Sequence, residues 1–204
     1  ICDLIKGDAV MRTIRLLAEA AARACVEGRL PAPELAATVG WAPQDTGNGN
    51  EVRFPVGRVV LQDASGLPLL VDLAALRNAV WRAGGDAARV NPAVPVTMVI
   101  DHSVIVEQNR GAGAFAYNLK READTNAERY RFARWAEGAF NNLYIVPPGN
   151  GIIHQIHMEA LVEVVSRRDG WRFSDVVIGT DSHTTMIGEA AGQRAADQIG
   201  RAHV

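Results

Sequence analysis

Val96-Thr-Met-Val-Ile100 is a run of apolar and β-branched residues, and Asp101 and His102 follow it directly. A run of this length and composition predicts a buried strand. Similar runs predict strands at 57–62, 143–146 and 175–178, and helical patterns between them predict helices at 72–84, 122–140 and 157–166. Strands that alternate with helices are typical of an α/β layer structure with a largely parallel sheet.

The segment before these elements predicts a helix over 8–27 and then a proline-rich linker over 31–55, with one short helix at 34–39. Cys25 lies on the apolar face of the first helix, where we interpret it as a small core residue. The only other cysteine is Cys2. Two cysteines are too few for a disulfide framework or an all-cysteine metal site.

The chain has 204 residues, 48% of them hydrophobic, and a formal net charge of −2. This composition is typical of a soluble globular protein with one domain or two small ones, and it excludes a globally disordered chain. The near-neutral charge indicates no basic surface for nucleic acid, and no apolar run is long enough to span a membrane. Because the first residues also lack a signal-peptide pattern, we expect a cytoplasmic protein.

Polar residues gather where three of the predicted strands end. These candidates are Asp101, His102, His154, His157, Asp181, Ser182 and His183. Open parallel sheets bind ligands at the carboxyl ends of their strands, so we expect a site there. An aspartate beside a histidine, as in Asp101-His102, can fix the imidazole tautomer and raise its proton affinity.

Each of these clusters also has a plain structural explanation, because aspartates cap turns and helices and histidine pairs occur on helix surfaces. Three clusters at three strand ends nevertheless favour a functional site. Two functions remain open from the residues alone. One is acid–base chemistry on a small anionic substrate. The other is a metal-dependent hydrolase, in which one or two divalent ions are held by Asp101, His102, Asp181 and His183.

Several motifs together resemble the N-terminal domain of the aconitase family, in matching order and approximate spacing over residues 55–187. They are Arg58-Val-Val-Leu-Gln-Asp63, Val71-Asp-Leu-Ala74, Asn91-Pro-Ala-Val-Pro-Val96, Val99-Ile-Asp-His-Ser103, Phe140-Asn-Asn142, Val146-Pro-Pro-Gly149, Gly151-Ile-Ile-His-Gln155 and Gly179-Thr-Asp-Ser-His-Thr-Thr185. The last of these is a specific signature, and the bacterial and cytosolic branch of the family is the most similar.

The resemblance implies a three-layer α/β/α domain of a hydro-lyase that removes and re-adds water across citrate, cis-aconitate and isocitrate. It also implies a [4Fe–4S] cluster with one open iron. Neither Cys2 nor Cys25 falls in a cluster-ligand motif, so we expect the cluster cysteines outside this chain. The family's serine base and substrate-binding arginines lie in later domains. We therefore expect this chain to be one part of the enzyme and inactive alone.

By the same resemblance, His102 paired with Asp101 is expected to protonate the leaving hydroxyl. Aspartate neighbours would keep its imidazole charged near neutral pH. Gln62 is expected to bind substrate. The remaining expected site residues are Asp181 and His154 around the leaving hydroxyl or bound water, and Asp181, Ser182 and His183 on the substrate and the oxygens on the cluster side.

The expected partners are a tricarboxylate substrate and the remaining domains of the full-length enzyme, with no membrane. Alternatives within the family are a 2-methylcitrate dehydratase and a non-catalytic or RNA-binding member. The near-neutral charge gives RNA binding no support.

The motifs divide the chain into three expected parts. Residues 1–54 form a helix and linker that match the family loosely, and residues 55–187 form the α/β domain that carries the site motifs. Residues 188–204 depart from the family pattern. Their last six can be back-translated to a common sequencing adapter, which suggests that this tail is an artefact.

Overall fold

The structure is a computed structural model that describes residues 12–40, 53–102, 104–150, 163 and 165–180. The chain forms two compact units. The first is made of Ile1–Val59 with His154–Val204, and the second of Val60–Ile153. Strand β1 (Arg58–Gln62) contributes its start to the first unit and its remainder to the second.

The second unit alternates strands and helices, as the sequence predicts. After β1 its elements are α3 (Asp63–Arg82), the 3₁₀ turn η2 (Ala87–Arg89), β2 (Val96–Val99), α4 (Ala114–Thr125), α5 (Ala127–Ala139) and β3 (Leu143–Val146). Strands β2 and β3 are parallel, with Val96 opposite Leu143 and Val99 opposite Val146. The strands expected at 57–62, 96–100 and 143–146 are thus confirmed.

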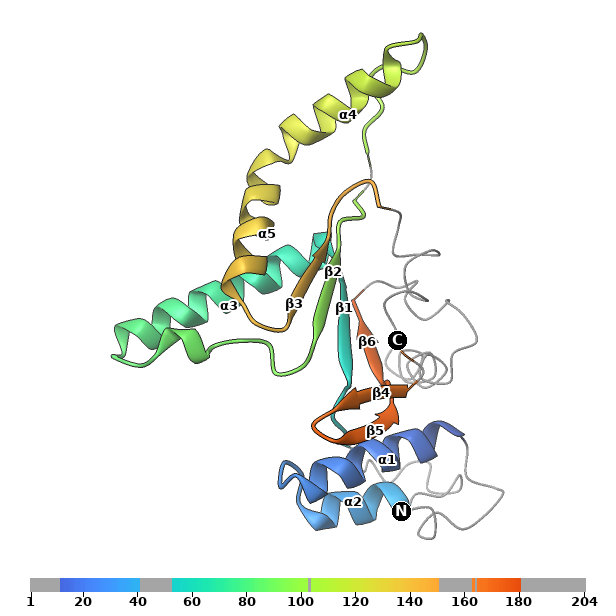
Figure 1. Ribbon diagram of the computed structural model, residues 1–204, viewed down its shortest axis with the longest axis vertical. Helices are drawn as coiled ribbons and strands as arrows, with labels where there is room; N and C mark the ends of the chain where they lie inside the picture. The colour runs from blue at the N-terminus through green and yellow to red at the C-terminus, as the bar shows by residue number, and fades with distance from the viewer. Residues whose placement is uncertain (1–11, 41–52, 103, 151–162, 164, 181–204) are drawn as a thin grey trace. The chain divides into compact units, whose positions relative to one another are not determined.

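The main sheet is parallel and has the strand order β3-β2-β1-β6, where β6 is Val177–Gly179 (Figure 1). Helix α3 packs on β2, and α5 packs on β3. Buried apolar side chains of the strands, among them Val60, Leu61 and Met98, form the core. A parallel sheet with flanking helices confirms the predicted α/β class and is consistent with the three-layer form that the resemblance implies.

Gly66 allows α3 to lie close to the sheet. A Cβ built on Gly66 would lie 2.6 Å from Sδ of Met98, whose side chain is fully buried. We expect Gly66→Ala to destabilise the chain by about 1–3 kcal/mol, because added volume in a packed core displaces side chains from their rotamers.

The matched control is Gly138→Ala on α5, where nothing lies within 4 Å of an added Cβ. There we expect a gain of up to about 1 kcal/mol from helix propensity. Urea unfolding followed by circular dichroism measures both changes. Equal effects of the two substitutions would contradict the close approach at Gly66.

The first unit contains two helices, a hairpin and strand β6. These elements are α1 (Arg12–Val26), α2 (Ala32–Val39), β4 (Val165–Arg168), β5 (Trp171–Ser174) and β6. Helix α1 packs against α2 and β5 with Leu17 and Ala21 on its buried face. Backbone N–H groups of Gly57 and Arg58 donate to Val176, which joins the start of β1 to this unit. Nε of Arg58 also donates to the buried Asp175 at 2.9 Å.

Two predicted helices have different bounds in the structure. The helix expected from Asp72 begins at Asp63 and contains Pro68. The helix accommodates both Gly66 and Pro68. The helix expected over 122–140 is two helices, which begin at Ala114 and meet at Asn126.

The helix predicted over 157–166 is wrong at its carboxyl end, because strand β4 begins at Val165. Residues 157–162 and 164 lie outside the described residues. The turn of this hairpin is Asp169-Gly170, with φ values of 52° and 81°. Asp-Gly is a strong two-residue hairpin signal, and it could have identified the hairpin from the sequence.

The last strand, Cys25 and the lengths of the helices can also be compared with the sequence predictions. The strand expected over 175–178 begins at Val177. Cys25 is partly exposed rather than a core residue. In the described part of the chain, no helix is both long and apolar enough to cross a membrane.

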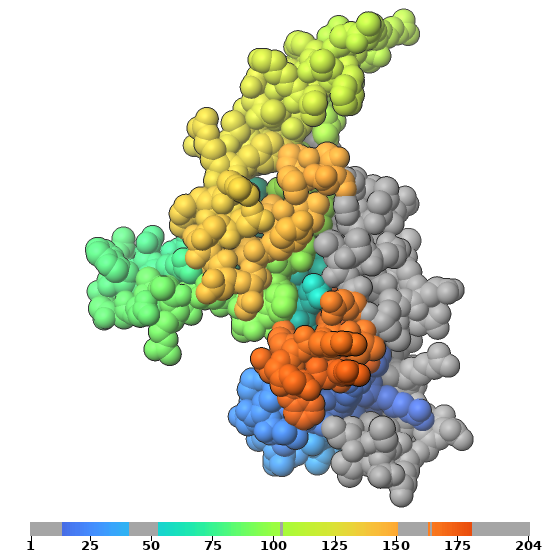
Figure 2. Space-filling view, in the orientation of Figure 1, coloured from blue at the N-terminus to red at the C-terminus, as the bar shows by residue number. Residues whose placement is uncertain are grey.

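Helix α4 stands out from the rest of the second unit, as the yellow-green surface in Figure 2 shows. None of its side chains is buried, and Phe115 and Leu119 are exposed. The end of α4 nevertheless reaches the polar cluster described next, because Glu122 lies in its last turn.

Candidate functional site

The candidate site forms where two neighbouring strands of the second unit end. Strand β1 ends at Gln62, and Asp63 is the first residue of α3. Strand β2 ends at Val99, and Ile100 and Asp101 lead to His102. Because β1 and β2 are adjacent in a parallel sheet, their carboxyl ends bring Asp63 and His102 together.

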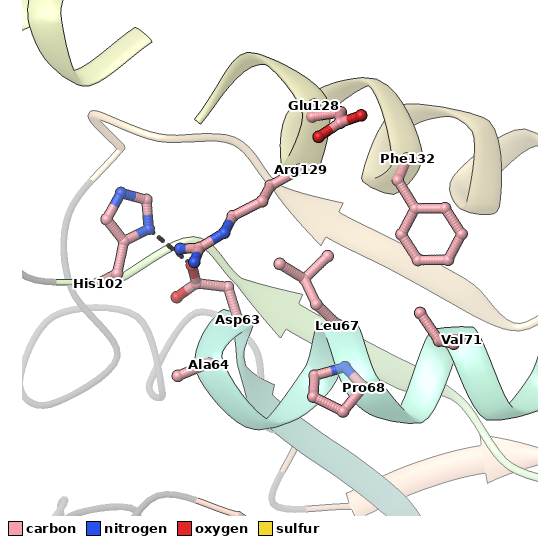
Figure 3. A pocket seen from close by; sticks show the side chains of 9 residues that line it. All are labelled: Asp63, Ala64, Leu67, Pro68, Val71, His102, Glu128, Arg129 and Phe132. Carbon is pink, nitrogen blue, oxygen red and sulfur yellow. Dashed lines mark hydrogen bonds and ion pairs between the residues drawn. The ribbon is translucent and has the colours of Figure 1, made fainter. Parts of the chain in front are cut away.

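His102 is held between two carboxylates. Its Nδ1 lies 2.6 Å from Oδ2 of Asp63, as Figure 3 shows, and its Nε2 lies 2.8 Å from Oε1 of Glu122. Asp63 is buried, and its Oδ1 accepts a hydrogen bond from the backbone N–H of Asp101 at 3.0 Å. The backbone therefore fixes the Asp63 carboxylate, which in turn orients the ring.

Asn126, between α4 and α5, and Tyr130 of α5 hold Glu122. Nδ2 of Asn126 lies 3.2 Å from Oε1 of Glu122 and 3.1 Å from Nε2 of His102. The hydroxyl of Tyr130 donates to the same Glu122 oxygen, and its ring stacks on the imidazole at a centroid distance of 6.2 Å. We call Asp63, His102, Glu122, Asn126 and Tyr130 the His102 cluster.

The electrostatics of the cluster favour a charged imidazole. Burial alone would lower the pKa of His102, but the hydrogen bonds to Asp63 and Glu122 outweigh burial and raise this pKa above its usual value. Burial and the nearby Glu122 carboxylate raise the pKa of the Tyr130 hydroxyl, which therefore stays protonated as a donor. A carboxylate at each ring nitrogen favours the imidazolium form, which carries a proton on both nitrogens.

His102 also lines three cavities of the second unit. The first, of about 530 Å³, lies between α3 and α5, with apolar side chains such as Leu67 and Phe132 in its wall and Arg129 pointing into it (Figure 3). The second, of about 640 Å³, includes Tyr130 and apolar residues of α4. The third, of about 300 Å³, includes Glu122 and Arg129. An imidazolium beside such spaces can meet a small ligand.

The structure brings together the predicted residues that it describes. Gln62 donates from Nε2 to the carbonyl oxygen of Asp101 at 3.4 Å, next to His102. Asp63 and Glu122 lie at the two ring nitrogens of His102. The pairing of Asp101 with the imidazole stays a prediction. The other predicted site residues lie outside the described residues, namely His154, Asp181, Ser182 and His183.

Sequence reasoning missed four members of the His102 cluster, namely Asp63, Glu122, Asn126 and Tyr130. Asp63 directly follows the predicted strand 57–62, so the strand-end rule that selected His102 also applies to it. Glu122, Asn126 and Tyr130 recur at intervals of four residues, which places them on one helical face. That spacing was the available signal.

The residues present do not fit a [4Fe–4S] cluster. Such a cluster needs cysteine thiolates, and the chain has two cysteines, of which the described one, Cys25, lies on α1 in the first unit. Among the described residues, no group of three or more His, Cys, Asp and Glu side chains is arranged to hold a metal ion. The hydrolase alternative also needs Asp181 and His183, which lie outside that part.

Comparisons with known proteins agree with the sequence motifs. Residues 35–196 match the sequence model of the aconitase family (aconitate hydratase). Aconitate hydratase A of Rickettsia felis (strain ATCC VR-1525 / URRWXCal2) is 47% identical over 137 residues, which is 67% of this chain. The chain spans 16% of the length of that relative.

Proposed function

This chain belongs to the aconitase family, and we propose that it forms part of a hydro-lyase that acts on a tricarboxylic acid. In this proposal the full-length protein interconverts citrate, cis-aconitate and isocitrate. The observation that carries the proposal is the imidazole of His102, held between Asp63 at the end of β1 and Glu122 of α4. Hydroxide is a poor leaving group, and a positioned acid can protonate it as it departs.

His102 is the acid in this proposal. Asp63 keeps Nδ1 protonated and orients the ring, so the proton on Nε2 is the one that can pass to the leaving hydroxyl and depart in water. Gln62 lies beside Asp101 at the same strand end, in a position to bind substrate. The resemblance adds His154, Asp181, Ser182 and His183 to the site, as residues around the substrate and the leaving oxygen.

The family's [4Fe–4S] cluster would act as a Lewis acid on the leaving oxygen. Because this chain lacks the cysteines for it, the cluster, the base and the substrate-binding arginines would come from the remaining domains of the full-length protein. Those domains and the tricarboxylate are the proposed partners. The cytoplasmic location expected from the sequence belongs to the same proposal.

A comparison of the complete protein with the 204-residue chain tests this function. We expect the full-length protein, purified without oxygen, to form cis-aconitate from both citrate and isocitrate, followed by its absorbance. The isolated chain should show no turnover above the uncatalysed reaction, because it lacks the cluster ligands. Turnover by the isolated chain would contradict the proposal, as would a full-length protein inactive on all three acids. Activity on 2-methylcitrate alone would identify the other dehydratase of the family.

A further inference from the structure

Glu122 receives more donors than a side chain with a purely structural role needs. Its Oε1 lies within hydrogen-bond distance of Nε2 of His102, Nδ2 of Asn126 and the hydroxyl of Tyr130. Its side chain is 9% exposed, whereas the side chain of Asp63 is 2% exposed. The two carboxylates therefore differ: Asp63 is more buried and is fixed by the backbone of Asp101, whereas Glu122 has no such backbone donor among the described residues and lines the cavities of about 640 and 300 Å³.

The two ring nitrogens of His102 consequently differ in how readily a ligand can approach them. Nδ1 is held by Asp63, which the backbone N–H of Asp101 fixes in place, so Asp63 keeps this proton although it also lines the cavity of about 530 Å³. Nε2 faces Glu122 and the cavities of about 640 and 300 Å³ that both residues line. A ligand that takes a proton from His102 must approach Nε2, and Glu122 occupies that position in the structure.

We propose that Glu122 is a positioning residue that holds the His102 imidazolium in place while substrate is absent, and that an anionic substrate replaces Glu122 at Nε2. This inference rests on the proposed role of His102 as the acid. Glu122 can release the imidazolium because Asn126 and Tyr130 continue to donate to its carboxylate. Without those donors, release would leave a mostly buried charge unpaired, which is costly.

Other charged groups also lie near His102, and their effect on its pKa must be distinguished from that of Glu122. Arg129 of α5 lines two of the cavities and opposes a charged imidazole, while Arg121 and Glu107 pair with each other at 3.0 Å. The titratable or charged groups near the ring are Asp63, Asp101, Glu107, Arg121, Glu122, Glu128, Arg129 and Tyr130. Of these, Asp63 and Glu122 contact the ring nitrogens directly.

The pH dependence of the full-length enzyme separates the substrate-free state from the substrate complex. An acid must be protonated, so activity falls as pH rises through the pKa of His102. The profile of kcat/KM reports the free enzyme, and that of kcat reports the complex. In Glu122→Gln, we expect the alkaline limb of kcat/KM to move to lower pH by about 1–2 units, because a neighbouring opposite charge is lost. The limb of kcat should move much less.

The matched control is Asp124→Asn on the same helix, which also removes one carboxylate. Asp124 is 55% exposed and pairs with Lys120 at the surface. We expect both limbs to remain in place in this variant. If Glu122→Gln lowers kcat and kcat/KM equally and moves neither limb, Glu122 has only a structural role and the proposal fails.

A second measurement is independent of turnover. Diethyl pyrocarbonate modifies neutral imidazole, so the rate of modification at His102 depends on the pKa of that residue. Peptide mass spectrometry measures this rate at a series of pH values across the range in which histidine titrates. In the substrate-free full-length protein, we expect the midpoint in Glu122→Gln to fall by about 1–2 pH units, with Asp124→Asn unchanged. An unchanged midpoint in Glu122→Gln overturns the proposal even if the enzyme is active. A shifted midpoint without turnover supports the contact and contradicts the proposed function.

Glu122→Asp keeps the charge but shortens the side chain, and it serves if Glu122→Gln does not fold. It should move the kcat/KM limb and the modification midpoint in the same direction by a smaller amount. An unshifted limb and midpoint in a folded Glu122→Asp protein would also count against the proposal.

Discussion

Replacing Asp63 by asparagine is expected to lower kcat of the full-length enzyme by about 10²–10⁴-fold. The two carboxylate oxygens of Asp63 hold Nδ1 of His102 at 2.6 Å and the backbone N–H of Asp101 at 3.0 Å. Asparagine fills the same space, but it removes the charge that stabilises the imidazolium. Its NH₂ group can also donate to Nδ1 and keep the ring neutral, and a neutral imidazole is a poor acid.

The control for Asp63→Asn is Asp72→Asn, which removes a carboxylate from an exposed position on the same helix. Steady-state formation of cis-aconitate measures kcat for both variants, and circular dichroism checks that each is folded. We expect Asp72→Asn to match the unsubstituted enzyme. A folded Asp63→Asn enzyme with kcat within about threefold of the unsubstituted enzyme would show that Asp63 does not orient the acid.

The strands of the sheet could be predicted from the sequence because most of their residues are apolar and many are buried. Such strands form short, nearly continuous apolar runs, as in β2, where all four residues are buried. The same runs locate the strand ends, and His102 follows one of them. The position of His102 at the carboxyl end of a strand could therefore be predicted from the sequence.

The partners of His102 could not be predicted with the same certainty, because they lie far from it in sequence. Asp63 is 39 residues before His102, and Glu122 is 20 residues after it. The adjacent Asp101 was the local choice, and its backbone N–H donates to Asp63. The end of the neighbouring strand and a later helix supply the carboxylates that lie at the two ring nitrogens.

The helix that carries Asp63 shows the same limit of local patterns. The sequence pattern placed the start of this helix at Asp72, whereas α3 begins at Asp63 and contains Gly66 and Pro68, residues that commonly interrupt helices. In the structure Gly66 is required by the close approach of Met98, and the helix continues through both positions. Tertiary packing decides these positions, and it is not visible in the local sequence.

Replacing His102 by glutamine tests the central claim, that this chain supplies the acid of an aconitase-type dehydration. Glutamine keeps a polar side chain near Asp63 and Glu122 but cannot carry a transferable proton. Loss of a general acid should lower kcat by about 10²–10⁴-fold, while KM should change less because the other contacts to substrate remain. The loss should be present with both citrate and isocitrate, since each must release a hydroxyl.

The deciding measurement is the rate of cis-aconitate formation by full-length His102→Gln and unsubstituted enzyme, at equal iron and sulfide content. If His102 is the acid, kcat of the variant falls by about 10²–10⁴-fold with both substrates. A folded variant with kcat within about tenfold of the unsubstituted enzyme would show that His102 is not the acid.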